Sequence, residues 1–199
     1  MPKSEDENQK IRDEQRTNIL RAAMSVFAQK GSAATMAEIA AEAKISQGLS
    51  YRYFPSKEAM LATLVKEAAQ SGGGPAARVK KIQGTPGERL ALLVSYILND
   101  RRERPQYYQF LYQVLADETI KSDLKQTVRE NGRIIQDEIK QLIAQGQTSG
   151  EIAKDDPEQL FIALVACIDG LVKWASWEGL NDKDNFPDAK IVLRMLKPD

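Results

Sequence analysis

The feature that most constrains the fold is a pair of short segments, each with its own helix-start signal, close to the amino terminus. Thr35 and Glu38 form a capping box ahead of "MAEIAAEA", and Ser46 is a good N-cap for "QGLSYRY". Only a short connection through Lys44 and Ile45 separates the two segments. Two short helices joined in this way predict a helix-turn-helix.

The rest of the chain also carries helical periodicity, and we find neither β-alternation nor an internal repeat. The expected fold class is therefore all-α, with about nine helices. We expect the first helix to start between Lys10 and Asp13, after a polar tail, and to end at Gly31. The later helices are expected from Ser56 into "SGGGP", from Thr85, from Pro105, from about Ile120 to Gln145 (closed by Gly146 and Gly150), from Asp156 to Gly179, and over "PDAKIVLRML".

The glycine run "SGGGP", Ser71 to Pro75, is the clearest boundary signal in the chain. We expect residues 1–55 to form a three-helix helix-turn-helix domain that binds DNA. A fourth helix at about 56–70 would connect it to a second helical domain over 72–199.

Composition excludes several classes of protein. The most apolar run, "LFIALVACI", is far shorter than the roughly 20 residues of a membrane span, and the start of the chain lacks the basic-then-apolar order of a signal peptide. Cys167 is the single cysteine, so no intramolecular disulfide can form, and we expect it to be a small buried hydrophobe. A cytoplasmic protein that does not enter the membrane is expected.

The sequence argues against catalysis. It contains no histidine, which is the commonest general base and transition-metal ligand, and "SGGGP" lacks the G-x-x-x-x-G-K pattern of a phosphate-binding loop. We therefore expect no catalytic residue, metal site or cofactor. The formal net charge is zero, so any attraction for nucleic acid must be local. Between Lys10 and Lys66 there are nine Lys or Arg against five Asp or Glu.

The short helix after Ser46 carries side chains suited to a DNA groove. Gln47, Gly48 and Tyr51 can share one surface of it. Gly48 costs about 1 kcal/mol relative to alanine inside a helix, unless the close approach of another body requires the missing side chain. Gln47 is the best candidate for reading bases, because glutamine can pair with adenine in the major groove.

Phosphate contacts are expected at the helix starts, where unpaired N–H groups and the helix dipole favour an anion. Thr35, Ser46 and Lys57 lie at three such starts. The hydroxyls of Tyr51 and Tyr53 and the cation of Arg52 can also reach the DNA backbone.

The stretch "GSAATMAEIAAEAKISQGLSYRYFPSKEAM", Gly31 to Met60, resembles the DNA-binding signature of the TetR family of transcriptional regulators. The resemblance implies a three-helix DNA-binding domain, a variable all-α ligand-binding domain, a homodimer, and usually repression. The positions that match the family's usual DNA contacts are Thr35, Ser46, Gln47, Gly48, Tyr51, Tyr53 and Lys57. Ser50 and Tyr53 depart from the commonest residues of the pattern, which leaves the operator sequence open.

The second domain shows no signature of its own. The helix after Asp156 is apolar nearly all round, so we expect one side to face its own core and another to face a second subunit. The residues assigned to the dimer interface are Leu160, Leu164, Ile168 and Leu171. Aromatic residues could line an effector pocket, although core packing explains most of them equally well: Tyr96, Tyr107, Tyr108, Phe110, Tyr112, Phe161 and Trp174. Asp169 would suit a cationic effector, whereas Gly170 beside it favours a tight helix crossing.

The sequence thus predicts a DNA-binding regulator, and specifically a repressor that a small-molecule effector releases from a palindromic double-stranded operator. A small all-α enzyme and a protein-binding adaptor without DNA binding are the alternatives. The effector, the operator and the regulated genes are not predicted.

Overall fold

The computed structural model describes residues 5–71, 82–178 and 186–198, and in these residues every regular element is a helix. The expected all-α fold is confirmed. The chain divides into two compact units. The first combines Met1–Gln70 with Gln106–Val128, and the second combines Ser71–Pro105 with Arg129–Asp199.

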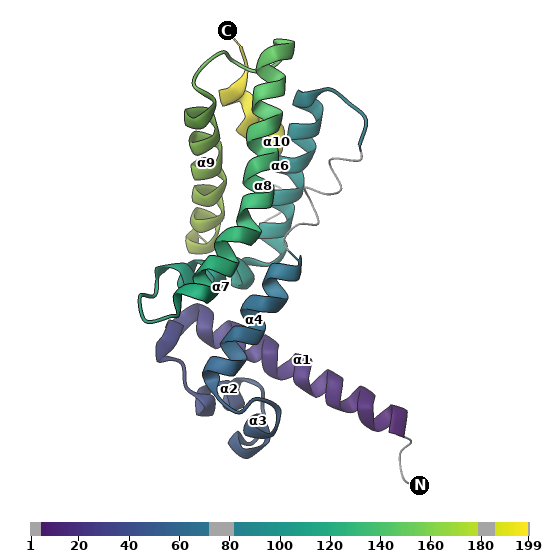
Figure 1. Ribbon diagram of the computed structural model, residues 1–199, viewed down its shortest axis with the longest axis vertical. Coiled ribbons are helices and arrows are strands. Elements are labelled where there is room, and N and C mark those ends of the chain that lie inside the picture. The colour runs from purple at the N-terminus through teal and green to yellow at the C-terminus, as the bar shows by residue number, and fades with distance from the viewer. Residues whose placement is uncertain (1–4, 72–81, 179–185, 199) are drawn as a thin grey trace. The chain divides into compact units, whose positions relative to one another are not determined.

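The described residues form nine α-helices and two 3-10 helices (Figure 1). The α-helices are α1 (Glu5–Lys30), α2 (Met36–Glu42), α3 (Gln47–Tyr53), α4 (Lys57–Ser71), α6 (Pro86–Glu103), α7 (Pro105–Ala116), α8 (Ser122–Ser149), α9 (Pro157–Glu178) and α10 (Ala189–Val192). The 3-10 helices are η1 (Gly31–Ala33) and η2 (Leu193–Leu196).

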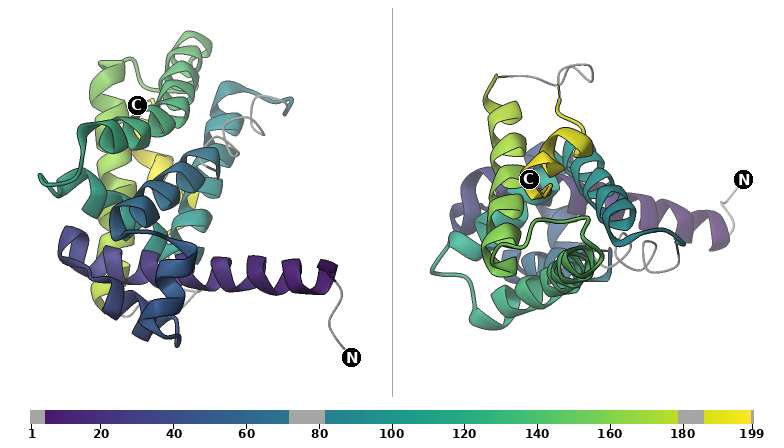
Figure 2. Two further views of the ribbon diagram at one scale, coloured as in Figure 1. Left: turned by 60° about the horizontal axis from the view of Figure 1, so that its bottom comes forward. Right: turned by 90° about the horizontal axis from the view of Figure 1, so that it is seen from above.

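The first unit packs α1 to α4 around one apolar core, to which α7 and the start of α8 also contribute. Ile19, Ile39 and Met60 are fully buried in it. Phe110 of α7 is fully buried as well, and its ring centre lies 6.5 Å from that of Phe27 in α1. The first half of α1 projects beyond α2 and α3 (Figure 2).

The second unit has a separate core built by α6, α8, α9 and the carboxyl-terminal helices. Leu93, Leu142 and Leu164, one from each long helix, are fully buried there. At the start of α6, Thr85 completes a capping box with Glu88, as its position before Pro86 predicts. No helix within the described ranges is long and apolar enough to cross a membrane.

Two expected helix ends differ from the structure. α1 begins at Glu5 rather than near Lys10, because three acidic residues in its first turn favour a helix start through the helix dipole. Gly146 lies inside α8 and does not close it. A Cβ there would be 2.6 Å from Cδ1 of Ile152, so the glycine is required by packing. Gly150 follows the end of α8 with φ +78°, as expected of a glycine that ends a helix.

The glycines of the "SGGGP" boundary lie outside the described residues. α7 packs in the same unit as the helix-turn-helix, although the sequence places it in the second domain. The functional division into a DNA-binding domain over 1–55 and a ligand-binding domain over 72–199 stays a prediction.

Candidate DNA-binding surface

α2 and α3 form a helix-turn-helix whose turn is fixed by local hydrogen bonds. Lys44 adopts a left-handed φ of +56°, which allows the sharp turn after α2. The side-chain amide of Asn18 in α1 donates to the carbonyl of Ala43 at 3.0 Å and so fastens the end of α2 to the core. The capping box at Thr35 is present, as predicted.

α3 presents one open face and one packed face. Ser46 caps the helix by accepting a hydrogen bond from the Leu49 amide at 3.3 Å. Ser50 is fully buried, and its hydroxyl donates to the Gln47 carbonyl at 2.7 Å. The residues of the opposite face, which are all exposed, are Gln47, Gly48, Tyr51 and Arg52.

Gly48 has no packing reason to be a glycine. A Cβ built at this position meets nothing within 4 Å, and α3 has ordinary helical backbone there. The cost of about 1 kcal/mol for glycine in a helix is therefore not offset within the described chain. The space in front of Gly48, between Gln47 and Tyr51 on the same face, is open to another molecule.

The two tyrosines of α3 have different surroundings. Tyr51 is 48% exposed, whereas Tyr53 is half-buried and packs against the core of the first unit. Phe54 is 4% exposed, and the guanidinium of Arg16 lies 5.5 Å from its ring centre. Tyr51 and Arg52 are thus the better-placed donors to a phosphate on this face, and Tyr53 has a larger structural role than its motif position suggests.

Thr35 is exposed, but its hydroxyl is already used. It accepts from the Glu38 amide at 3.2 Å and donates to the Glu38 carboxylate at 3.0 Å. Lys30 also donates to this carboxylate at 2.6 Å, and its hydrogen bond, with those from Thr35, lowers the pKa of Glu38. A phosphate contact by the Thr35 hydroxyl would require exchange of its bond to Glu38.

Ser46 and Lys57, the other two phosphate ligands predicted at helix starts, differ in whether their donors are already used. Ser46 is exposed and its oxygen acts as an acceptor, so its hydroxyl proton can be donated to a phosphate. Lys57 is half-buried, and its ammonium donates to the carbonyls of Ser32 at 2.6 Å and Ala34 at 3.2 Å. Two of its three N–H groups therefore hold the turn between α1 and α2.

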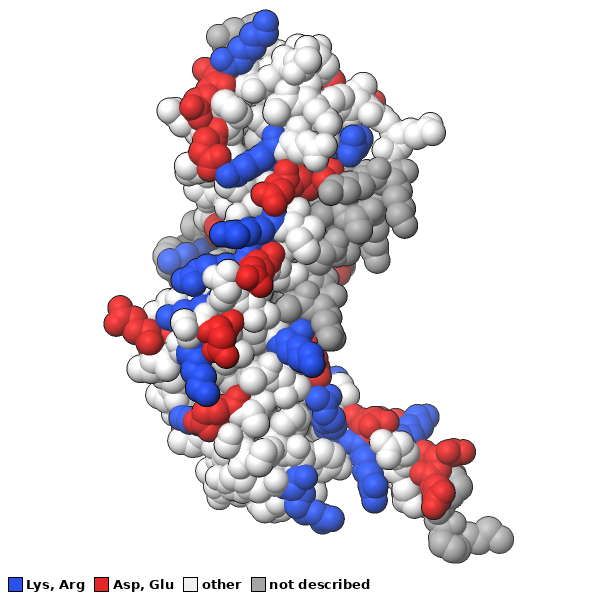
Figure 3. Space-filling model, in the orientation of Figure 1, with Lys and Arg blue, Asp and Glu red and all other residues white. Residues whose placement is uncertain are grey.

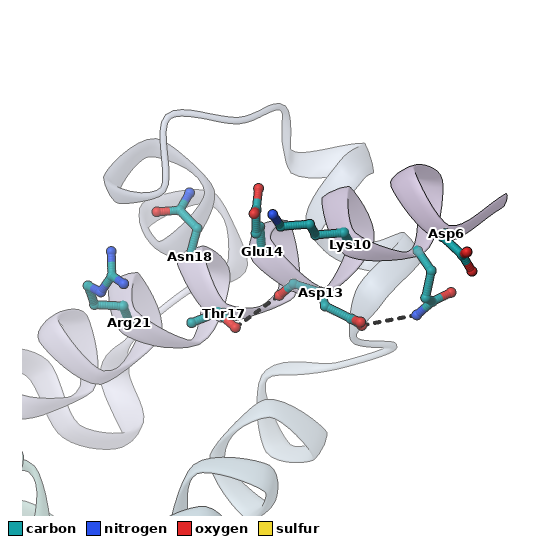
Figure 4. Close-up of a pocket in the computed structure, with 8 residues that line it drawn as sticks. Asp6, Lys10, Asp13, Glu14, Thr17, Asn18 and Arg21 are labelled. Atoms are coloured by element: carbon teal, nitrogen blue, oxygen red, sulfur yellow. Dashed lines mark hydrogen bonds between the residues drawn. The ribbon is translucent and has the colours of Figure 1, made fainter. Parts of the chain in front are cut away.

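The charged side chains of the molecule are mixed in sign. On the face drawn in Figure 3, basic and acidic side chains are interspersed. A shallow depression runs along α1, and all of its lining residues belong to that one helix (Figure 4). It contains both signs of charge, including Lys10, Asp13 and Arg21. A hollow lined by a single helix is unlike the enclosed apolar pocket that an effector would need.

The residues predicted to line an effector pocket are divided between the two units. Tyr107, Tyr108, Phe110 and Tyr112 belong to the first unit, and Tyr96, Phe161 and Trp174 belong to the second. Phe110 is wholly enclosed by the first core, while Tyr112 and Trp174 are 44% and 50% exposed. In the second unit Lys140 places its ammonium 4.6 Å from the ring centre of Phe161. No observation assigns these residues to a ligand site, and the pocket stays a prediction.

The residues assigned to the dimer interface lie mainly in or against the core of their own unit. Leu160, Leu164 and Ile168 are at most 8% exposed and belong to the core of their own unit, and Leu171 packs against that core. Leu160, Leu164 and Ile168 therefore offer little surface to a second subunit, whereas Leu171 is only partly buried. The sequence periodicity identified an apolar stripe of α9, and its assignment to the dimer interface stays a prediction.

A different face of α9 is exposed; the sequence analysis noted Gly170 and Trp174 but did not assign this face to the dimer interface. It combines large apolar side chains with small residues in a row, namely Ile162, Ala163, Ala166, Gly170 and Trp174, and the exposed polar side chains of Gln159 and Lys173 lie on the same face. Ile162 is 57% exposed, and a Cβ at Gly170 would meet nothing within 4 Å. The small residues at helical spacing were the available signal.

Asp169 of α9 is ion-paired with Arg101 of α6, and Arg101 is largely buried. The charge of Asp169 is therefore compensated by Arg101 within the unit, so there is no longer a reason to expect a cationic effector at Asp169. Glu138, which is 2% exposed, forms a second ion pair between helices of this unit, with Arg89 at 3.2 Å. Within the described ranges no group of side chains could hold a metal ion.

Comparison with known proteins agrees with this geometry. Residues 19–64 match the sequence pattern of "Bacterial regulatory proteins, tetR family", and residues 83–196 match that of "Tetracyclin repressor-like, C-terminal domain". The chain is 27% identical over 149 residues to the HTH-type transcriptional repressor NicS of Pseudomonas putida, covering 72% of this chain and 68% of that protein. A 48-residue segment is 50% identical to the uncharacterized HTH-type transcriptional regulator YuxN of Bacillus subtilis, which covers 24% of this chain but only 16% of YuxN.

Solved structures share the fold at low sequence identity. The MbdR regulator of Azoarcus sp. CIB has a TM-score of 0.73 at 24% identity, over 91% of this chain and 94% of that one. The transcriptional regulator FadR of Bacillus subtilis, solved with stearoyl-CoA, has a TM-score of 0.64 at 22% identity, over 91% and 97%. The two sequence patterns together cover most of the chain, and the helix-turn-helix stands where the first of them requires it. The chain therefore belongs to the TetR family of bacterial regulatory proteins.

Proposed function

We propose that this TetR-family transcriptional regulator is a homodimeric repressor that reads a palindromic operator with α3. The observation that carries the proposal is the open space in front of Gly48. A helical glycine without a packing role is expected where a second body approaches the backbone closely. Gln47 and Tyr51 flank it on the same exposed face.

The residues of this face have separable roles. Gln47, in the first turn of α3, pairs with a base edge in the major groove. Tyr51 and Arg52 donate to phosphates, as does the hydroxyl of Ser46. Tyr53, Thr35 and Lys57 support the arrangement through intramolecular contacts and add phosphate contacts where a donor remains.

The exposed face of α9 is the proposed contact with the second subunit. A row of Ala163, Ala166 and Gly170 permits close approach of a helix from an identical chain, and Ile162 and Trp174 supply apolar area at its margins. An isologous contact of this kind relates the two α3 helices by a two-fold axis. Two half-sites one helical turn apart, about 34–36 Å, are then read together.

Regulation follows from the same symmetry. A small molecule that binds the second unit in one dimer geometry stabilises that geometry, and the operator loses affinity if the two α3 helices no longer match successive grooves. The proposed mechanism has no catalytic step.

The test is a binding assay on DNA fragments from the region next to the protein's own gene, with a salt titration and an excess of unrelated competitor. We expect one fragment to bind far more tightly than competitor, with an affinity that falls steeply with salt. Equal and weak binding to all fragments would favour the adaptor alternative. Sedimentation of the same sample reports whether the bound species is a dimer.

A further inference from the structure

The turn between α1 and α2 is held from two segments that are distant in the sequence. The carboxylate of Asp117, which follows α7, accepts a hydrogen bond from the Ser32 amide at 2.8 Å. Lys57, at the start of α4, donates to the carbonyls of Ser32 and Ala34. The amide of Ser32 therefore bonds to Asp117 and its carbonyl to Lys57, two side chains that are far apart in the sequence.

The Asp117 carboxylate is itself oriented. Its other oxygen accepts from the Thr119 amide at 3.0 Å and from the Thr119 hydroxyl at 2.6 Å. The Thr119 and Ser32 hydrogen bonds hold the pKa of Asp117 well below its ordinary value. The group that meets the Ser32 amide is thus a carboxylate, whose hydrogen bonds are about twice as strong as those of a neutral acceptor.

Gly31 shows how closely the turn lies against the end of α7. It is buried and adopts a left-handed φ of +55°. A Cβ at this position would be 2.5 Å from Nε2 of Gln113 and 2.8 Å from the carboxylate of Asp117. The turn is therefore packed directly against the side chains around Asp117.

α7 has two further attachments in the same unit. The Tyr107 hydroxyl donates to the Ala68 carbonyl near the end of α4 at 3.1 Å, and Phe110 is buried in the core beside Phe27. Of these contacts, the hydrogen bond between Asp117 and Ser32 lies nearest to the start of α2, because Thr35, the N-cap of α2, follows Ser32 by three residues.

We propose that Asp117 is a positioning residue for DNA binding. It fixes the turn from which α2 starts, and α2 in turn packs against α3. Without the carboxylate the turn loses one of its two side-chain anchors, and α3 samples orientations in which its base contacts form less often, while its phosphate contacts are kept. The inference rests on the proposed function, in which α3 reads the operator.

The experiment compares Asp117→Ala with Glu118→Ala, which removes the same charge from the adjacent, exposed position. Operator and competitor affinities are measured over a range of salt, with circular dichroism as a check on folding. We expect Asp117→Ala to lower operator affinity on the order of tenfold. The salt slope and the competitor affinity should stay as in the wild type, because no phosphate contact is removed. Glu118→Ala should bind like the wild type.

Hydrogen exchange gives a second readout. The Ser32 amide should exchange faster in Asp117→Ala than in the wild type. Wild-type operator affinity in a folded Asp117→Ala variant, or an equal loss in Glu118→Ala, would overturn the proposal. Failure of the wild type itself to prefer any DNA would instead overturn the proposed function.

Thr119→Ala decides the matter if Asp117→Ala does not fold. It removes the hydroxyl that orients the carboxylate, together with an exposed methyl group, and keeps the amide bond of residue 119 to Asp117, so we expect a loss of about two- to threefold in operator affinity with an unchanged salt slope. A folded Thr119→Ala variant with wild-type operator affinity would contradict the positioning role.

Discussion

Replacing Gly48 by alanine should stabilise the protein and lower its affinity for operator DNA. Because a Cβ at this position meets nothing within 4 Å, the methyl group adds no strain and fills no cavity. The difference in helix propensity, at most about 1 kcal/mol because Gly48 is the second residue of α3, then appears as added stability of the free protein. On DNA, the methyl group stands between Gln47 and Tyr51 and separates the helix from the groove wall.

The expected loss of operator affinity equals that of one disrupted bidentate base contact, about 1–3 kcal/mol, which is roughly 5- to 150-fold. Urea denaturation measures the stability, and fluorescence anisotropy with labelled operator measures the affinity at fixed salt. Gly132→Ala is the matched control, because Gly132 lies inside α8 and its Cβ also meets nothing within 4 Å.

The control should gain similar stability without a change in affinity. If Gly48→Ala gained stability and bound the operator as tightly as the wild type, no second body would approach this face closely. If Gly48→Ala lost stability, the space in front of Gly48 would not be open as the structure shows it.

Three further substitutions test other parts of the account. Lys57→Ala should lower the free energy of unfolding by about 1–3 kcal/mol, because two carbonyls lose a charged donor, and should lower the salt slope of DNA binding by up to about one unit. Unchanged stability in urea would contradict the role of Lys57 in the turn. Ala166→Glu should convert the dimer to a folded monomer that loses most of its operator affinity, whereas Ala41→Glu at an exposed position of α2 should leave the sedimentation coefficient of the dimer unchanged. A dimeric Ala166→Glu variant would argue against the α9 interface. Because its pKa is lowered, ionised Asp117 contributes stability above the pKa of an unfolded aspartate, near 4, and this stability is lost as the pH falls below it. Asp117→Asn should therefore flatten the acid side of the plot of unfolding free energy against pH. A plot parallel to that of the wild type would contradict this.

Local signals in the sequence were sufficient for the helix-turn-helix. Thr35 and Ser46 cap their helices as predicted, because capping depends on residues only three positions apart. The open face of α3 was also predictable, since helical spacing alone puts Gln47, Gly48 and Tyr51 on one side.

What the sequence did not predict depends on information that periodicity does not contain. A helix that is apolar nearly all round gives no sign of which side meets its own core, and Leu164 was therefore assigned to a partner although it is fully buried in its own unit. The hydrogen bond between Asp117 and Ser32 joins residues 85 positions apart, so no local sequence pattern predicts it. The sequence predicted a phosphate contact for Lys57 from its place at a helix start, but it gave no sign of its bonds to the carbonyls of Ser32 and Ala34, which depend on the folded turn.

The central claim is that the exposed face of α3 reads base edges, and parallel selection from a random DNA library with wild type and Gln47→Ala tests it most directly. The account predicts that the wild type enriches a palindrome with half-sites about one helical turn apart. Gln47→Ala should enrich the same palindrome with its preference relaxed at one position of each half-site. An identical motif from both proteins, or no motif from the wild type, would contradict it.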